Sequence, residues 1–218
     1  MDFELSPTCQ IKNLKEIYER FFSEERDRIF VEVGASDGYS HSNTWGLAKA
    51  GWRGLYFEPV PELANKCSFN HKDNDVIVKN IAIGNKVGVT KLYLGSSPTI
   101  NEETVDKNPW DFTYDKNNFI MVPVSTLNRE LDNLLLYTTV IDLLVIDVEG
   151  AELEVLEGLD FLTYIPEMII IESCEGNPEV KKTFHTQQIL KYFENLPYTK
   201  IQSDGINSIF INTPYLEN

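Results

Sequence analysis

Acidic residues that directly follow short apolar runs are the first candidates for chemistry in this sequence. Glu58 comes after the run 55–57, and Asp147 and Glu149 come at the end of the run 141–146. In an open parallel sheet, ligands bind beyond the carboxyl ends of the strands. Glu58 is therefore placed to accept hydrogen bonds from both hydroxyls of a ribose. Asp147 and Glu149 could serve as a general base, as metal ligands or as anchors for an amine.

Each of these acids also has a purely structural explanation. Glu58 could be a solvated charge at the end of a strand. Asp147 or Glu149 could do no more than stabilise the N-terminus of the next helix by its charge. Glutamate is a poor strand former, however, so its presence at position 149 favours a functional role there.

A glycine-bearing turn follows the apolar run 29–33. Residues 34–38 read G-A-S-D-G, and glycine lets a backbone turn sharply and approach a ligand closely. The dinucleotide fingerprint G-x-G-x-x-G would require glycine where this chain has Ser36. A nicotinamide cofactor needs that glycine beside its pyrophosphate. S-adenosylmethionine instead carries an amino-acid tail, whose ammonium group is favoured by an acid such as Glu32. Together with Glu58, the turn favours an adenosine-type ligand.

Histidine supplies a competing base. His41 follows the glycine turn closely, so it could approach a reacting group at the edge of the bound ligand. The alternative is an ordinary surface histidine at the start of a helix. His71 and His185 lie in polar, helical stretches of the sequence, and we expect both of them at the surface.

The elements that position these residues follow from the apolar periodicity. Strands alternate with helices along the chain, which predicts a mostly parallel sheet covered by helices on both faces. Ser203-Asp204-Gly205 is a hairpin turn that adds an antiparallel strand at the end. The strand at 89–94 could form a hairpin with the strand before it. The expected strands are 29–33, 54–57, 76–83, 89–94, 122–127, 141–147, 168–172, 198–202 and 208–211, and the expected helices are 11–22, 42–50, 61–69, 128–136, 150–159 and 179–196.

Length and composition fit a single domain over residues 1–218. The chain has 218 residues, of which 42% are hydrophobic and 24% charged, which is enough for one large domain with its own core. Residues 1–27 form an N-terminal helical extension. Residues 96–120 break the strand–helix rhythm and form a lid insertion. Its aromatic residues could stack on a sugar or close over the pocket, or they could only pack the insertion onto the domain; they are Trp110, Phe112 and Tyr114.

Charge and cysteine usage exclude several classes of protein. The net charge is -15, from 34 acids against 19 bases, which argues against nucleic-acid binding, and Lys181-Lys182 is the densest basic cluster. Cys9, Cys67 and Cys174 have no C-x-x-C spacing, so neither a disulfide framework nor a metal site is expected. The N-terminus lacks the pattern of a secretory signal and no apolar run could span a bilayer, so we expect a cytoplasmic protein without membrane contact.

The sequence resembles the FkbM family of S-adenosylmethionine-dependent methyltransferases. The resemblance covers about residues 30–159. It implies an α/β, class I methyltransferase (Rossmann-like) fold, with a mostly parallel seven-stranded sheet, helices on both faces and an antiparallel C-terminal strand. The matching stretches, of which the last is the most specific, are V-E-V-G-A-S-D-G-Y-S, Y-F-E-P, N-I-A-I-G, V-P-V-S-T-L and L-L-V-I-D-V-E-G-A-E-L-E-V-L-E-G.

The resemblance also implies where the cofactor lies. The turn 34–38 would lie beneath S-adenosylmethionine, Asn80 and Ile81 would flank the adenine, and Asp147 would lie beside the methionine part or the reacting methyl group. The family usually reads T-L-D where this chain has Asn128 at the third position, which implies a structural role there. The cofactor-binding residues implied are Glu32, Gly34, Ala35, Ser36, Asp37, Gly38, Glu58, Pro59, Asn80, Ile81 and Asp147.

The resulting functional prediction is a methyltransferase. Members of the family mostly methylate hydroxyl oxygens, often on sugars or natural products, so the expected partner is a small-molecule or glycan acceptor. Asp147, Glu149 or His41 would act as the base, and Glu172 and Glu175 could bind a polyhydroxyl acceptor. Two alternatives remain: a nicotinamide-dependent oxidoreductase, which Ser36 disfavours, and a non-catalytic cofactor-binding module. The identity of the acceptor and the oligomeric state stay open.

Overall fold

The computed structural model describes residues 3–24, 26–107, 114–134, 140–176 and 186–216. Its main feature is a seven-stranded sheet with the order β3-β2-β1-β7-β8-β10-β9. The first five of these strands are parallel, and β10 runs antiparallel to both of its neighbours, β8 and β9, as the sequence predicted for one strand of the closing hairpin. The strands are β1 (Ile29–Val33), β2 (Arg53–Phe57), β3 (Val76–Lys79), β7 (Val140–Ile146), β8 (Ile165–Glu172), β9 (Tyr198–Ser203) and β10 (Asn207–Asn212).

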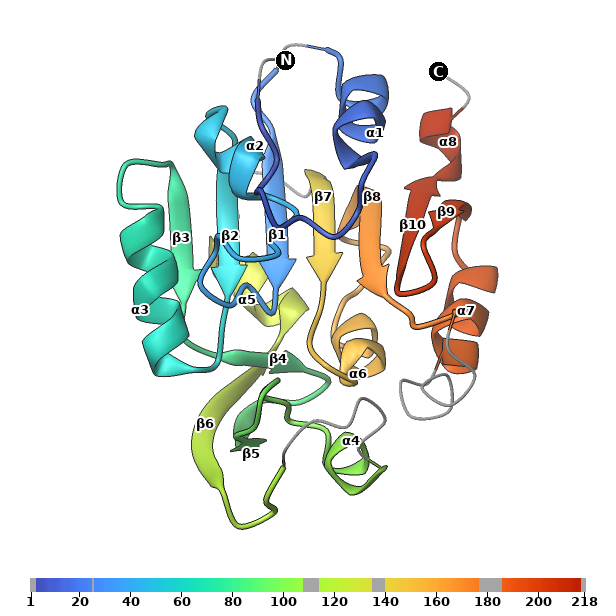
Figure 1. The fold of residues 1–218 in the computed structure, drawn as a ribbon. Helices are drawn as coiled ribbons and strands as arrows, with labels where there is room; N and C mark the ends of the chain where they lie inside the picture. The colour runs from blue at the N-terminus through green and yellow to red at the C-terminus, as the bar shows by residue number, and fades with distance from the viewer. Residues whose placement is uncertain (1–2, 25, 108–113, 135–139, 177–185, 217–218) are drawn as a thin grey trace.

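Helices cover both faces of this sheet (Figure 1). Every residue of β1 is buried, because a parallel strand between two helical layers has no solvent-exposed face. Phe30 and Tyr56 pack with α1, α2 and α3 on one face, whereas Val31 and Phe57 pack with α5, α6 and α7 on the other. The helices are α1 (Leu14–Phe21), α2 (Trp45–Lys49), α3 (Pro61–Asn70), α4 (Glu102–Lys107), α5 (Leu127–Leu134), α6 (Glu152–Glu157), α7 (Thr186–Glu194) and α8 (Thr213–Leu216).

A second, three-stranded sheet has the order β4-β6-β5. It lies beyond the carboxyl ends of the parallel strands, whose arrowheads point toward it in Figure 1. β4 runs parallel to β6, and β5 runs antiparallel to β6. This sheet therefore closes the edge at which the sequence placed the candidate site. Its strands are β4 (Ala82–Gly84), β5 (Gly88–Tyr93) and β6 (Phe119–Thr126).

Two strand predictions were wrong in this region. Residues 76–83 form two strands in different sheets, not one, because the Asn80 side chain donates hydrogen bonds to the carbonyl oxygens of Glu58 and Pro59, both at 2.9 Å. These bonds fix the point at which the chain leaves the main sheet. The expected hairpin of 89–94 with the preceding strand is also wrong, since β5 pairs with β6.

Four helices start one to three residues away from the predicted position; α1 begins at Leu14 rather than at 11, and α2 begins at Trp45 rather than at 42. α5 begins at Leu127, and the hydroxyl of Thr126 accepts the backbone N–H of Arg129 at 3.3 Å. Asn128 is therefore not the cap, but its side-chain oxygen accepts the N–H of Asp160 at 3.3 Å, which is a structural role as expected. α6 begins at Glu152 rather than at residue 150.

The prediction that His71 lies at the surface was wrong. His71 is 2% exposed, and its Nε2 donates to the carbonyl oxygen of Gly38 at 2.7 Å. Its Nδ1 lies 3.1 Å from the side-chain oxygen of Asn74. The histidine thus anchors the glycine turn to the end of α3. The positions of Lys181, Lys182 and His185, and the first part of the helix predicted at 179–196, lie outside the described residues.

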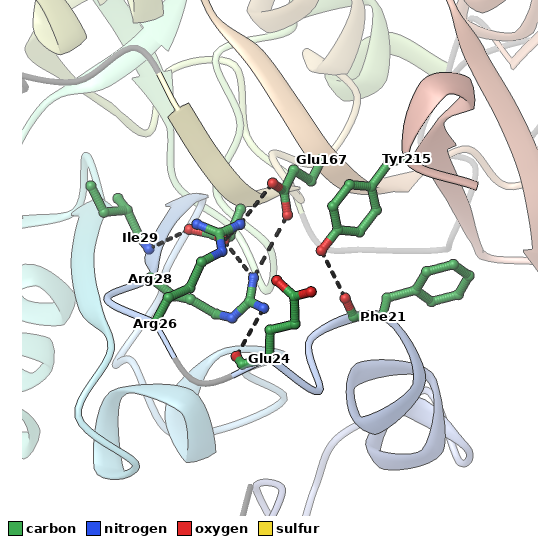
Figure 2. Close-up of polar contacts among 8 residues, drawn as sticks. Phe21, Glu24, Arg26, Arg28, Ile29, Glu167 and Tyr215 are labelled. Carbon is green, nitrogen blue, oxygen red and sulfur yellow. Dashed lines mark hydrogen bonds and ion pairs between the residues drawn. The ribbon is translucent and has the colours of Figure 1, made fainter. Parts of the chain in front are cut away.

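Charged side chains, two of them buried, join the opposite, N-terminal ends of three strands (Figure 2). Arg28, at the start of β1, donates from Nη1 to Asp142 of β7 at 2.6 Å, and the second oxygen of Asp142 accepts the N–H of Ile29 at 2.8 Å. Arg26 donates to Glu167 of β8 at 2.7 Å. Arg28 and Asp142 are both almost fully buried. Such a pair stabilises the fold only while both charges are present.

Within the part of the chain that the structure describes, no helix is both long and apolar enough to cross a membrane.

The substitution Asp142→Asn is expected to lower the free energy of unfolding by about 3 kcal/mol, because it leaves Arg28 buried opposite an uncharged group. Urea denaturation at neutral pH measures this change. The control is Glu19→Gln, which breaks the exposed pair between Lys15 and Glu19 and should cost less than about 1 kcal/mol. Equal losses in the two variants would contradict the assigned role of the buried pair.

Candidate active site

A cavity of about 500 Å³ opens at the carboxyl edge of the main sheet. Its walls come from the ends of β1, β2 and β7, from β4 and β5, and from residues 96–100 of the insertion. The strand order reverses between β1 and β7, and α/β sheets bind their ligands at such a switch point. The cavity therefore occupies the position that the sequence predicted for the site.

Carboxylates dominate the charge of this cavity. Glu32, Glu58, Asp147 and Glu149 all line it, and none of the described residues that line it is a lysine or an arginine. Four acids without a counter-charge favour a cationic ligand and repel phosphate groups. This charge pattern argues against a dinucleotide with its pyrophosphate.

The glycine turn brings the ends of three strands together. Gly34 has a φ of +88°, and a Cβ at this position would overlap the carbonyl oxygen of Asp147. The N–H of Gly34 donates to Phe57 at 2.9 Å, and the N–H of Asp147 donates to Val33 at 3.0 Å. The pairing of β2, β1 and β7 thus continues into the turn. Only glycine, which has no Cβ, lets the turn approach the end of β7 this closely.

Asp37 and Gly38, the last two residues of the turn, stabilise its conformation but do not line the cavity. Asp37 accepts the backbone N–H groups of Tyr39 and Ser40, at 3.0 and 2.7 Å. Gly38, with a φ of +69°, packs too closely against Cys67 to carry a Cβ. Asp37, Gly38 and Asn80 are not among the residues that line the cavity, whereas the other predicted cofactor-binding residues are: Glu32, Gly34, Ala35, Ser36, Glu58, Pro59, Ile81 and Asp147.

Glu58 is only 5% exposed, so the alternative of a solvated charge is wrong. Its Oε2 accepts the N–H of Ser36 and its Oε1 accepts the N–H of Val60, both at 2.8 Å. Burial raises the pKa of Glu58 to about 7. Each oxygen keeps a further lone pair that can accept a hydroxyl from a ligand.

Glu32 lies deeper at the end of β1. Its Oε2 accepts hydrogen bonds from the hydroxyls of Ser42, at 3.3 Å, and Thr44. Thr44 also lies 2.9 Å from the hydroxyl of Tyr56. Burial raises the pKa of Glu32 to about 7, although these hydroxyls partly oppose the shift. Neutral hydroxyl groups therefore hold the carboxylate of Glu32 in place, and none of these donors carries a positive charge.

Asp147 and Glu149 face the cavity side by side at the end of β7. Burial, and then the charge of Glu32, raise the pKa of Asp147 to about 6. Burial, and then the charge of Asp147, raise the pKa of Glu149 to about 7. Glu172, at the end of β8, is hydrogen-bonded to Asp147, and burial raises its own pKa well above the ordinary value. A pKa near neutrality suits a group that accepts a proton during catalysis.

Glu152 has the structural role that was considered for Glu149. Its Oε1 accepts the N–H groups of Val148 and Gly150, at 3.0 and 3.1 Å, and thereby closes the turn that leads into α6. Sequence reasoning missed this residue, although an acid in the first turn of a predicted helix was a usable signal. Because Glu152 satisfies these backbone groups, the carboxylate of Glu149 can face the cavity.

His41 lies at the rim of the same cavity. It has a φ of +60°, and its N–H donates to the hydroxyl of Thr8 at 2.8 Å. The N-terminal segment thus packs along the loop after the glycine turn, and its Gln10 lines the cavity. Gln10 and the serines Ser96 and Ser97 carried no sequence signal. The role of His41 as a base stays a prediction.

The insertion contributes a wall of the cavity through residues 96–100. The hydroxyl of Tyr114 donates to the carbonyl oxygen of Ser97, so this aromatic residue connects two separate segments of the insertion. Trp110 and Phe112 lie outside the described residues. Among the described residues, no group of three or more histidine, cysteine, aspartate or glutamate side chains is arranged to hold a metal ion.

Comparison with known proteins gives one family and several solved structures that share the fold. The family model described as "Methyltransferase FkbM domain" matches residues 32–199. A search of curated proteins found no match. A protein of Staphylococcus aureus that was assigned as a caffeoyl-CoA O-methyltransferase has a TM-score of 0.54 at 12% identity, covering 95% of this chain and 86% of its own. One from Klebsiella pneumoniae that was assigned as an O-methyltransferase has a TM-score of 0.53 at 15% identity, covering 95% and 84%. At these identities the two structures establish the fold alone.

Glu152 predicts how stability depends on pH. Burial raises its pKa to about 8, so the folded state binds more protons than the unfolded state between the ordinary glutamate pKa and about 8. The free energy of unfolding should therefore fall as the pH rises through that window. Glu152→Gln should make this fall shallower, at about 1.4 kcal/mol for each unit by which the pKa of Glu152 is raised, measured by urea denaturation between pH values of about 5 and about 9.

The matched control is Glu62→Gln, which makes the same change at an exposed position in the first turn of α3. It should leave the pH dependence as in the wild type. A Glu152→Gln variant with an unchanged pH dependence would show that this carboxyl group titrates as it does in the unfolded chain.

Proposed function

This chain belongs to the FkbM methyltransferase family, and we propose that it transfers the methyl group of S-adenosylmethionine to a hydroxyl of a sugar, a glycan or another small molecule. The observation that carries the proposal is the charge of the cavity. Its four carboxylates, Glu32, Glu58, Asp147 and Glu149, stand without a lysine or arginine among the described lining residues. A ligand with a sulfonium and an ammonium group matches that charge.

The residues present fit this cofactor. The two oxygens of Glu58 can accept the ribose hydroxyls, since each already accepts only one backbone N–H. Ile81 offers an apolar surface for the adenine, and the backbone of Gly34 lines the cavity directly beside the end of β7. Glu32 or Asp147 can hold the ammonium group.

When bound, the cofactor supplies a methyl group on a positively charged sulfur, which is an activated donor for displacement at carbon. A hydroxyl acceptor is a weak nucleophile, so a base that takes its proton helps the reaction. Glu149 is that base in our proposal, because its pKa of about 7 lets it receive the proton near neutral pH. The walls of the cavity hold the acceptor in line and exclude water. His41 at the rim is the second candidate for the base.

The two alternative functions have less support. A nicotinamide cofactor would bring its pyrophosphate beside four carboxylates, and Ser36 replaces the glycine that such a cofactor requires. A non-catalytic module would not need an acid held near neutral pKa beside the ligand. In this chain Glu149 is such an acid, with a pKa of about 7. Its backbone is held in a left-handed conformation with a φ of 58°.

Glu58→Gln is expected to weaken S-adenosylmethionine binding about tenfold or more, because one acceptor for the ribose hydroxyls becomes a donor. Isothermal calorimetry measures the dissociation constants of the variant and of the wild type. The wild type should bind S-adenosylmethionine and should not bind NAD. The exposed change Glu62→Gln serves as the control. Tighter binding of NAD than of S-adenosylmethionine would overturn the assignment of the cavity.

Glu149→Gln is expected to lower methyl transfer about 100-fold while the affinity for S-adenosylmethionine changes much less. Release of S-adenosylhomocysteine is measured on a panel of methyl glycosides, simple alcohols, phenols and amines. Hydroxyl acceptors should react and amines should not. Unchanged turnover in Glu149→Gln would remove this residue from the catalytic role, and His41→Gln would then be assayed in the same way.

A further inference from the structure

The insertion between β5 and β6 touches Glu149 and the backbone beside it. The side chain of Ser97 forms a hydrogen bond with the Glu149 carboxylate. The side-chain Nδ2 of Asn101 donates to the carbonyl oxygen of Gly150. The insertion therefore holds both the reactive group of Glu149 and the peptide that follows it.

Asn101 has a fixed orientation because both ends of its amide are engaged. Its Oδ1 accepts the backbone N–H groups of Glu103 and Thr104, at 2.9 and 3.2 Å, at the start of α4. Its own N–H donates to the hydroxyl of Thr99 at 3.0 Å. With the oxygen turned toward α4, the amide nitrogen must face Gly150. Asn101 is 8% exposed, so water does not easily replace these bonds.

The backbone at Glu149 needs such support. Glu149 has a φ of 58° and Gly150 a φ of 103°, and a left-handed conformation costs a residue with a side chain about 1 kcal/mol or more. Glu152 accepts the N–H of Gly150 from one side, and Asn101 donates to its carbonyl oxygen from the other. A Cβ at Gly150 would overlap the hydroxyl of Thr104, so α4 packs directly on this turn.

We propose that Asn101 is a positioning residue for methyl transfer, which ties the insertion to the backbone beside Glu149 and so keeps the Glu149 carboxylate in the cavity. The expected effect on turnover rests on the proposed function. The position of Glu149 itself can be measured without turnover. Loss of the tie lets the turn relax from its left-handed conformation and moves the carboxylate toward solvent.

The surroundings of Glu149 define the measurement. The groups that face it are Asp147 from the end of β7, Glu172 from the end of β8, and Ser97 and Tyr114 from the insertion. Burial is the main reason that its pKa is raised, and the charge of Asp147 adds to it. A carboxylate that leaves this environment therefore titrates at lower pH.

Asn101→Ser is the test variant, because serine keeps an oxygen that can cap α4 but lacks the amide donor to Gly150. Asn118→Ser is the matched control. It makes the same chemical change in the same insertion, where the exposed side chain of Asn118 donates to the carbonyl oxygen of Leu94 at 3.4 Å. Thermal unfolding and calorimetry with S-adenosylmethionine verify that each variant is folded. If Asn101→Ser does not fold, Asn101→Thr, which also keeps a capping oxygen and adds no charge beside Glu149, is used instead.

The first readout is the pKa of Glu149 in the protein labelled with carbon-13 at the glutamate carboxyl groups. Its nuclear magnetic resonance signal is assigned by its absence in Glu149→Gln. Asn101→Ser should lower this pKa by about one unit, and Asn118→Ser should leave it unchanged. A folded Asn101→Ser variant in which the pKa of Glu149 has not moved overturns the proposal.

The second readout is turnover on the acceptor found with the panel. Asn101→Ser should lower kcat about tenfold with little change in the KM for S-adenosylmethionine, and it should cause no further loss in the Glu149→Gln background. An equal further loss in that background overturns the proposal. If the wild type binds S-adenosylmethionine but methylates no member of the panel, the proposed function fails, while the titration of Glu149 still decides the role of Asn101.

Discussion

The approach of Gly34 to the carbonyl oxygen of Asp147 is the constraint on which the rest of the site depends. A Cβ at Gly34 would overlap that oxygen, so the ends of β1 and β7 can lie together only with glycine at this position. The N–H of Gly34 on Phe57 and the N–H of Asp147 on Val33 extend the sheet pairing to this point. Three strand ends thus meet at one place, and each of them brings an acid.

Burial of these acids costs free energy. Glu32, Glu58, Asp147 and Glu149 are all raised in pKa chiefly by burial, which means that their ionised forms are disfavoured in the free protein. A cationic ligand with hydroxyl and ammonium donors supplies the partners they lack. Binding of that ligand therefore stabilises the fold as well as the complex. The paired charges of Arg28 and Asp142 lie near the opposite, N-terminal ends of β1 and β7, away from these buried acids.

The sequence predicted those parts of the site that depend on local patterns. Glu58, Asp147 and the turn 34–38 follow apolar runs, and the carboxyl ends of parallel strands share one edge of a sheet. The mostly parallel sheet followed from the same alternation, and its seven strands followed from the resemblance to the FkbM family. The three-stranded sheet did not, because its strands pair across the insertion and because Asn80 ends β3 through bonds to distant carbonyl oxygens.

Residues whose partners are backbone atoms far along the chain were beyond sequence reasoning. Asn101 acts on Gly150, and His71 on Gly38, over separations that no periodicity records. The polar neighbours of His71 in sequence suggested exposure, although the fold places its ring under the glycine turn. Glu152 differs from these two, because its position in the first turn of a helix was visible and only its target was not.

Backbone strain around the cavity follows a common pattern. Ser36, His41 and Glu149 line the cavity in left-handed conformations. In each case a side chain from another position accepts a nearby N–H: Glu58 at Ser36, Thr8 at His41, and Glu152 at the Gly150 that follows Glu149. Strain of this kind persists only where the surroundings hold it. The cavity walls are therefore ordered before a ligand arrives, so binding does not have to order them. Carboxylates that already stand in position are also the arrangement that stabilises a transition state most effectively.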